Sequence, residues 1–114
     1  MVNYNDRYFI GVKNYDNGDL NKETVFRYRQ KNKVVWGSFE GGGAMHGNFI
    51  ARVLDGDKLD MRWQYLNKKG EFCCGTCVST PETLPDGRIR LHESWKTAGA
   101  EPQEGISVIE ELPY

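Results

Sequence analysis

The chain has 114 residues, of which 39% are hydrophobic and 12% aromatic, and its formal net charge is -1. This length predicts a single domain, residues 1–114, and this composition excludes an intrinsically disordered chain. The balanced charge excludes a strong electrostatic attraction to nucleic acid or to an anionic membrane, and no run approaches the roughly 20 apolar residues of a membrane span. The N-terminal residues lack the pattern of a secretory signal, so we expect a cytoplasmic protein without nucleic-acid or membrane partners.

Short runs of alternating polarity, separated by turn signals, make up the chain. Helix signals are nearly absent, because 13 glycines interrupt the sequence and no run repeats apolar residues at helical spacing. Asp16-Asn17-Gly18-Asp19 is the strongest hairpin signal, since Asn-Gly tolerates positive φ at both central positions. In chain order, we predict strands at 7–15, 20–30, 33–40, 47–54, 58–67, 71–79, 87–97 and 105–112, each antiparallel to its neighbours.

Pairing consecutive strands predicts the register, because paired residues point to the same face of a sheet. The predicted pairs are Phe26 with Gly37, Gly37 with Ala51, Phe49 with Trp63, Tyr65 with Phe72, and Trp95 with Ile106. One face is then apolar along the whole sheet, including Phe72, Val78, Ile106 and Val108. The opposite face is polar, with Ser107 and Glu111 among its members, although Val34, Trp36, Ile50 and Ile109 interrupt it.

An apolar face of this size has no predicted helix to cover it. Curling the sheet into a closed barrel buries that face and removes the exposed edges. The sequence therefore predicts an all-β fold, a single antiparallel up-and-down barrel of about eight strands with little or no helix. A sandwich of two sheets is the main alternative.

Two glutamates, Glu93 and Glu110, fall on the predicted apolar face of neighbouring strands. A buried carboxylate must be paired, hydrogen-bonded or neutralised, so these residues are candidates to anchor a ligand or to act as general acid and base. The alternative is structural: both lie in water at the barrel rim, or they bond to Tyr28, Tyr65 or Gln30.

Large aromatic residues share that face and are candidates for a ligand pocket. Eight strands leave an interior that either holds one small molecule or is filled by side chains, and both alternatives stay open. The predicted ligand-binding residues are Tyr28, Trp63, Tyr65, Glu93, Trp95 and Glu110.

Arg62, Arg88, Arg90 and His92 fall on the outer face, where an anion site and a solvated exterior are both compatible with the pattern. The three cysteines lie within Cys73–Cys77, and we expect reduced thiols. Cys74 and Cys77 have redox-motif spacing, but in an extended strand they point to opposite faces. No second Cys/His cluster is available for zinc, so we expect no metal and no cofactor.

From residue 23 onward the sequence resembles a family of small uncharacterised bacterial proteins. The segments that carry the resemblance are ETVFRYRQ, VWGSFEGG, LDMRWQY, STPE, LPDGRIRLHESW and GISVIEE. Members of this family often carry the label N-acetylglutamate synthase, and the resemblance implies that name. An acetyltransferase of the usual kind has a glycine-rich pyrophosphate loop between a strand and a helix, and no helix is predicted here. In architecture the chain is similar to the avidin and lipocalin barrels.

Three functions follow from these features. The first is a binding module that takes a compact, partly apolar ligand into the barrel mouth, with Trp63, Tyr65 and Trp95 against its body and the glutamates at its polar end. The second is an enzyme that uses Glu93 or Glu110 as acid and base, with Arg62 or Arg90 nearby. The third is an interaction module, in which Val34, Trp36 and Ile50 form an outward apolar patch that makes a homodimer.

Overall fold

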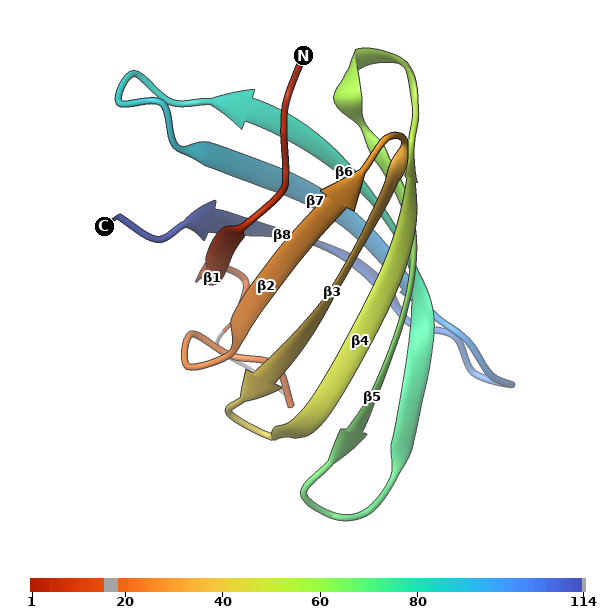
Figure 1. Cartoon of the computed structure of the whole chain (residues 1–114). Helices are drawn as coiled ribbons and strands as arrows, with labels where there is room; N and C mark the ends of the chain where they lie inside the picture. The colour runs from red at the N-terminus through yellow and green to blue at the C-terminus, as the bar shows by residue number, and fades with distance from the viewer. Residues whose placement is uncertain (16–18, 114) are drawn as a thin grey trace.

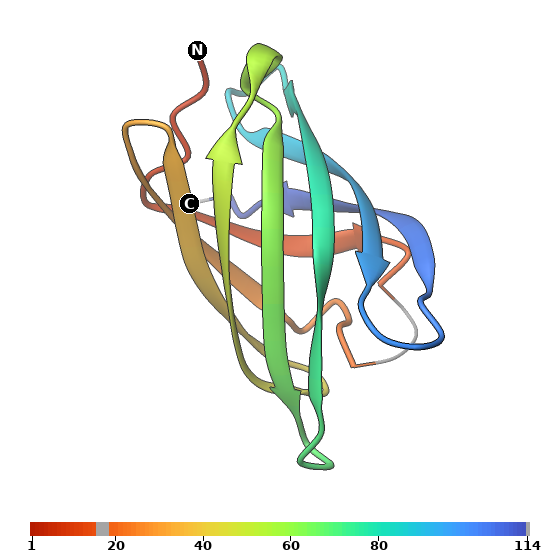
Figure 2. The same ribbon diagram turned by 90° about the vertical axis from the view of Figure 1, so that its right-hand side faces the viewer.

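The computed structural model describes residues 1–15 and 19–113, and these fold into a closed barrel of eight antiparallel strands in sequence order (Figures 1 and 2). Because β1 pairs with β8, the sheet has no open edge. This confirms the predicted up-and-down barrel and not the sandwich. The strands are β1 (Arg7–Lys13), β2 (Val25–Lys31), β3 (Val34–Gly41), β4 (Ala44–Val53), β5 (Leu59–Asn67), β6 (Phe72–Thr83), β7 (Ile89–Thr97) and β8 (Glu104–Glu111).

Helix is nearly absent, as predicted. Among the described residues the one helical element is the 3-10 turn η1 (Asp55–Asp57) between β4 and β5. No described helix is long and apolar enough to cross a membrane. The turn predicted at Asp16-Asn17-Gly18-Asp19 falls mostly on residues 16–18, which lie outside the described residues.

The predicted faces hold from β2 to β5. The β4–β5 register is the predicted one, with Phe49 opposite Trp63. Between β2 and β3, Phe26 pairs with Phe39 instead of Gly37, and Gly37 pairs with Phe49 instead of Ala51 across β3 and β4. These registers differ from the prediction by two residues, and a shift of two leaves every side chain on its predicted face.

The predicted register of β6 against β5 is wrong by one residue. Tyr65 pairs with Cys73 instead of Phe72, so Phe72 and Val78 point outward. The reason is the turn at 68–70: Asn67 N donates to Glu71 O at 3.0 Å, and Gly70 has a φ of 80°. The loop has three residues, and the third is left-handed. A loop with an odd number of residues places each side chain of the second strand on the face opposite to the one that an even-numbered loop would give.

The predicted register of β8 against β7 is wrong for the same kind of reason. Thr97 N donates to Gln103 O at 2.8 Å, which leaves five residues, 98–102, in the loop. Trp95 therefore pairs with Gly105, and Glu93 pairs with Ser107. Six assignments are corrected by this shift: Ile106, Val108 and Glu110 lie on the outer face, while Ser107, Ile109 and Glu111 lie on the inner face.

The end of the barrel that carries both termini is closed by the N-terminal segment (Figure 1). Tyr4 is fully buried, its hydroxyl donates to Asp57 O at 2.6 Å, and its backbone N donates to Gln30 Oε1 at 2.7 Å. Its ring centroid lies 6.2 Å from that of Tyr28, on the barrel wall. The core therefore fills the barrel from this end.

Aromatic rings on the inner wall lie against glycines of the neighbouring strand. Four cross-strand pairs have this form: Gly37 with Phe49, Gly47 with Phe39, Gly75 with Trp63, and Gly105 with Trp95. A methyl group on any of these glycines would come within 2.6 Å of its ring partner. The missing side chains let the rings lie along the wall instead of across the barrel, which leaves space along the axis.

Candidate functional site

A cavity of about 240 Å³ occupies the barrel at the end opposite Tyr4. The connection after β1 and the β7–β8 loop form part of its lining through Asn14, Asp19, Leu20 and Gln103. At about 30 Å³ for each water molecule, the cavity has the volume of about eight waters. The alternative of a completely filled interior therefore does not hold.

Glu93, from the middle of β7, lies deep in this cavity and is one of its lining residues. Tyr15 Oη donates to Glu93 Oε1 at 2.5 Å, and Ser107 Oγ donates to the same oxygen at 2.9 Å. Ser107 reaches Glu93 because the two residues pair directly across β7 and β8. Glu93 thus lies on the inner face as predicted, but its partners are neither Tyr28, Tyr65 nor Gln30.

Burial governs the acid–base chemistry around Glu93. Desolvation raises the pKa of Glu93 above its ordinary value, against the opposing effect of the hydrogen bonds from Tyr15 and Ser107. Desolvation and the nearby Glu93 charge also raise the pKa of Tyr15 and Tyr28 well above their ordinary value, and that of Cys77 to about 12. The two phenols and the thiol therefore stay neutral at physiological pH.

Several polar atoms in the cavity are left without a protein partner. Both hydrogen bonds that Glu93 accepts from described residues end on Oε1, so Oε2 has no hydrogen-bond partner among them. Tyr28 Oη and Trp95 Nε1 make no hydrogen bond to any described residue, although both side chains line the cavity. No buried side-chain nitrogen or oxygen atom of the described residues lacks a partner, so these three atoms are accessible to solvent, and all three residues line the cavity.

The mouth is shaped by Asp19, whose backbone O accepts a hydrogen bond from Gly43 N at 2.6 Å in the β3–β4 turn. Tyr65 Oη and Asn67 Nδ2 each donate to Asp19 Oδ2 at 3.1 Å. The Tyr65 and Trp63 rings stack, with centroids 5.9 Å apart. The predicted residues Tyr28, Trp63, Tyr65, Glu93 and Trp95 thus line one cavity, and their role in ligand binding stays a prediction.

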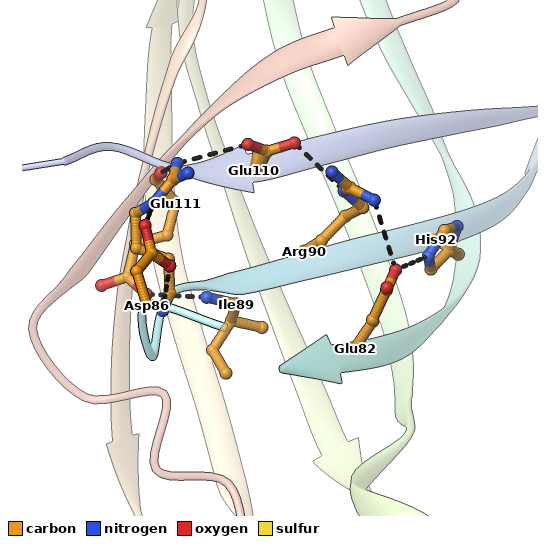
Figure 3. Close-up of polar contacts among 8 residues, drawn as sticks. Glu82, Asp86, Ile89, Arg90, His92, Glu110 and Glu111 are labelled. Atoms are coloured by element: carbon orange, nitrogen blue, oxygen red, sulfur yellow. Dashed lines mark hydrogen bonds and ion pairs between the residues drawn. The ribbon is translucent and has the colours of Figure 1, made fainter. Parts of the chain in front are cut away.

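Glu110 lies outside the barrel, so its predicted placement on the inner face is wrong. It accepts from Arg88 Nη1 at 3.2 Å and from Arg90 Nε at 3.1 Å (Figure 3). Its neighbour Glu111 is instead the inward residue, 2% exposed, where it accepts from Arg7 Nη1 at 2.6 Å and from Ile89 N at 3.0 Å. The one-residue register shift of β8 exchanges these two glutamates.

The outer-face cations are paired with carboxylates. Arg90 and His92 contact Glu82, as Figure 3 shows, and Arg88 contacts Asp86 and Glu110. Arg62 contacts Asp60. The barrel wall therefore separates Glu93 from Arg62 and Arg90. Of the pairs expected for the enzyme, Glu110 lies beside Arg90 but on the outer face, and Glu93, the interior glutamate, has Tyr15 and Ser107 as its partners.

The remaining candidate residues, the cysteines and the outer apolar residues, lie on the strands of the barrel wall. Cys73, Cys74 and Cys77 are free thiols. Cys74 and Cys77 point to opposite faces, as predicted, but the shifted register of β6 makes Cys77 the buried one and Cys74 the exposed one. Val34, Trp36 and Ile50 are exposed on the outer face, also as predicted. Whether they form a homodimer contact stays a prediction.

Sequence reasoning missed Tyr15, Asp19 and Ser107. Tyr15 was expected in a strand over 7–15, but β1 ends at Lys13, so Tyr15 and Asp19 lie beyond it and alternation along the strand does not give their direction. Ser107 was assigned to the outer face through the register error. The available signal was the glycine–aromatic pairing: placing Gly105 opposite Trp95 puts Ser107 opposite Glu93.

Comparisons with known proteins agree with this architecture. Residues 2–112 match the family model for avidin-like proteins, so the chain belongs to the avidin-like family. No curated protein matches the chain.

Proposed function

We propose that this avidin-like barrel binds one small organic ligand in the cavity at its open end. The observation that carries the proposal is that a cavity of about 240 Å³ contains polar atoms without protein partners, namely Glu93 Oε2, Tyr28 Oη and Trp95 Nε1. Buried polar groups are normally satisfied, and a ligand or ordered water supplies what the protein does not. Eight-stranded barrels of this architecture are known to hold a single small molecule.

The lining favours a ligand with a flat or compact apolar body and one polar end. Apolar surface dominates the wall through Phe26, Phe39, Phe49 and Met61, while Tyr15 and Ser107 form a polar cluster with Glu93. Ligand pockets commonly have this composition, with a few placed polar groups that fix orientation. The cavity lies slightly below the usual range of about 300–1,000 Å³, which limits the ligand to a compact molecule.

Three probes with the same phenyl body test the proposal: phenethylamine, phenethyl alcohol and hydrocinnamate. We expect at least one to raise the melting temperature and to give a saturable heat of binding by calorimetry. Trp95→Ala removes a wall residue and should weaken that binding by at least about tenfold, whereas Trp36→Ala, the matched change on the outer face, should leave it unchanged. An equal loss of affinity in the Trp95→Ala and Trp36→Ala variants, or no binding by any probe, contradicts the proposal.

A further inference from the structure

The charge of the cavity lining is one-sided. Among the described residues it contains two carboxylates, Glu93 deep inside and Asp19 at the mouth, and no lysine or arginine. The arginines of β5 and β7 are on the other side of the wall and are paired there. A ligand entering the barrel therefore meets negative or neutral groups only.

Aromatic faces dominate the same surface. Eight of the seventeen lining residues are aromatic, and they include Tyr28, Trp63, Tyr65 and Trp95. The negative face of an aromatic ring attracts a cation, and the attraction strengthens where water is excluded. A carboxylate inside such a cage adds a direct ionic partner, whereas an anionic ligand would face like charge without a compensating cation.

We propose that the ligand is a compact organic cation, an amine or ammonium compound, whose charge lies against Glu93 Oε2 and whose body packs between Tyr65 and Trp95. The inference rests on the proposed function and adds the chemical class of the ligand. Glu93 Oε1 is already held by Tyr15 and Ser107, so the carboxylate is fixed in orientation and Oε2 is the oxygen left for the ligand.

The binding should depend on pH through Glu93. The titratable groups that face it are Tyr15 beyond β1, Tyr28 on β2 and Cys77 on β6, and burial raises the pKa of all three. They stay neutral while Glu93 changes charge, and Ser107 on β8 does not titrate. Protonation of Glu93 in acid removes the ionic partner, so affinity for a cation falls as pH falls through the pKa of Glu93.

The three probes, which share one phenyl body and differ in the charge of the polar end, separate this inference from the proposed function. By calorimetry at neutral pH, phenethylamine should bind at least about tenfold more tightly than phenethyl alcohol, and hydrocinnamate most weakly. Glu93→Gln should weaken phenethylamine binding by at least about tenfold more than it weakens phenethyl alcohol binding. Glu110→Gln makes the same chemical change outside the barrel (Figure 3) and should alter neither.

The outcomes are distinguishable. If phenethyl alcohol or hydrocinnamate binds as tightly as phenethylamine, the cation inference is overturned and the proposed function stands. If no probe binds, both are overturned. Should Glu93→Gln fail to fold, the wild-type protein still decides, because its affinity for phenethylamine must fall as the pH is lowered, whereas that for phenethyl alcohol must not.

Discussion

At the scale of single residues, Glu93 makes the barrel sensitive to pH even without a ligand. Its pKa in the folded protein is raised above 4.5 by burial. As pH rises from 4.5 to that raised value, the unfolded chain loses its proton first, so the free energy of unfolding decreases. Each unit by which the pKa is raised lowers the stability at neutral pH by about 1.4 kcal/mol.

We predict that Glu93→Gln removes this contribution, because glutamine keeps an oxygen that accepts from Tyr15 and Ser107 but does not ionise. In urea unfolding, the variant should be more stable than wild type at neutral pH, and the two should converge below about pH 4. A difference in unfolding free energy that stays constant across this pH range would contradict the prediction.

The adjacent glutamates of β8 allow a second comparison. Glu111 is buried and accepts hydrogen bonds from Arg7 and from the backbone N of Ile89, whereas Glu110 lies on the outer face, partly exposed, beside Arg88 and Arg90. Glu111→Ala leaves these donors unsatisfied and should cost about 3 kcal/mol in unfolding free energy. Glu110→Ala should cost less than about 1 kcal/mol. Chemical denaturation measures both, and equal losses would mean that Glu111 is not the buried partner.

At the scale of strands, the glycine–aromatic pairs determine the width of the cavity. An alanine at residue 105 would place its methyl group 2.6 Å from Trp95 Cζ2, so the indole must move toward the barrel axis. We predict that Gly105→Ala costs about 1–3 kcal/mol in stability and also weakens phenethylamine binding.

Gly87→Ala is the control for that change. Gly87 has a φ of 89° in the β6–β7 turn and no atom within 4 Å of an added methyl group. The free energy of unfolding of the Gly87→Ala variant should fall by about 1–2 kcal/mol through backbone strain alone, and its affinity for the ligand should stay unchanged. A Gly105→Ala variant that binds as wild type does would disprove the link between this glycine and the cavity.

The strand scale also explains which features could be predicted from sequence. Alternation placed Trp63, Tyr65 and Glu93 on the inner face, because face assignment within a strand needs no knowledge of the loops. Transfer of that assignment to the next strand depends on whether the loop is odd or even, which Lys68-Lys69-Gly70 and residues 98–102 do not reveal by composition. Glu110 and Ser107 were exchanged between faces for this reason, whereas two-residue shifts elsewhere caused no error of face.

At the scale of the whole molecule, the barrel has one filled end and one hollow end. Tyr4 and the N-terminal segment close the end that carries both termini, and the connection after β1 and the β7–β8 loop border the cavity at the other (Figures 1 and 2). The eight-stranded barrel could be predicted from the sequence, because no predicted helix was available to cover the apolar face of the sheet. The division between filled and hollow could not, because it depends on where Tyr4 folds back and on rings that lie against glycines.

The three tryptophans allow the most direct test of a ligand-binding interior. Trp63 and Trp95 line the cavity and Trp36 lies on the outer face, so a proton–nitrogen correlation spectrum contains one outer and two inner indole signals. On titration with phenethylamine, the signals of Trp63 and Trp95 should shift with a common saturation curve while that of Trp36 stays in place. A shift confined to Trp36, or equal shifts of all three, would contradict binding inside the barrel.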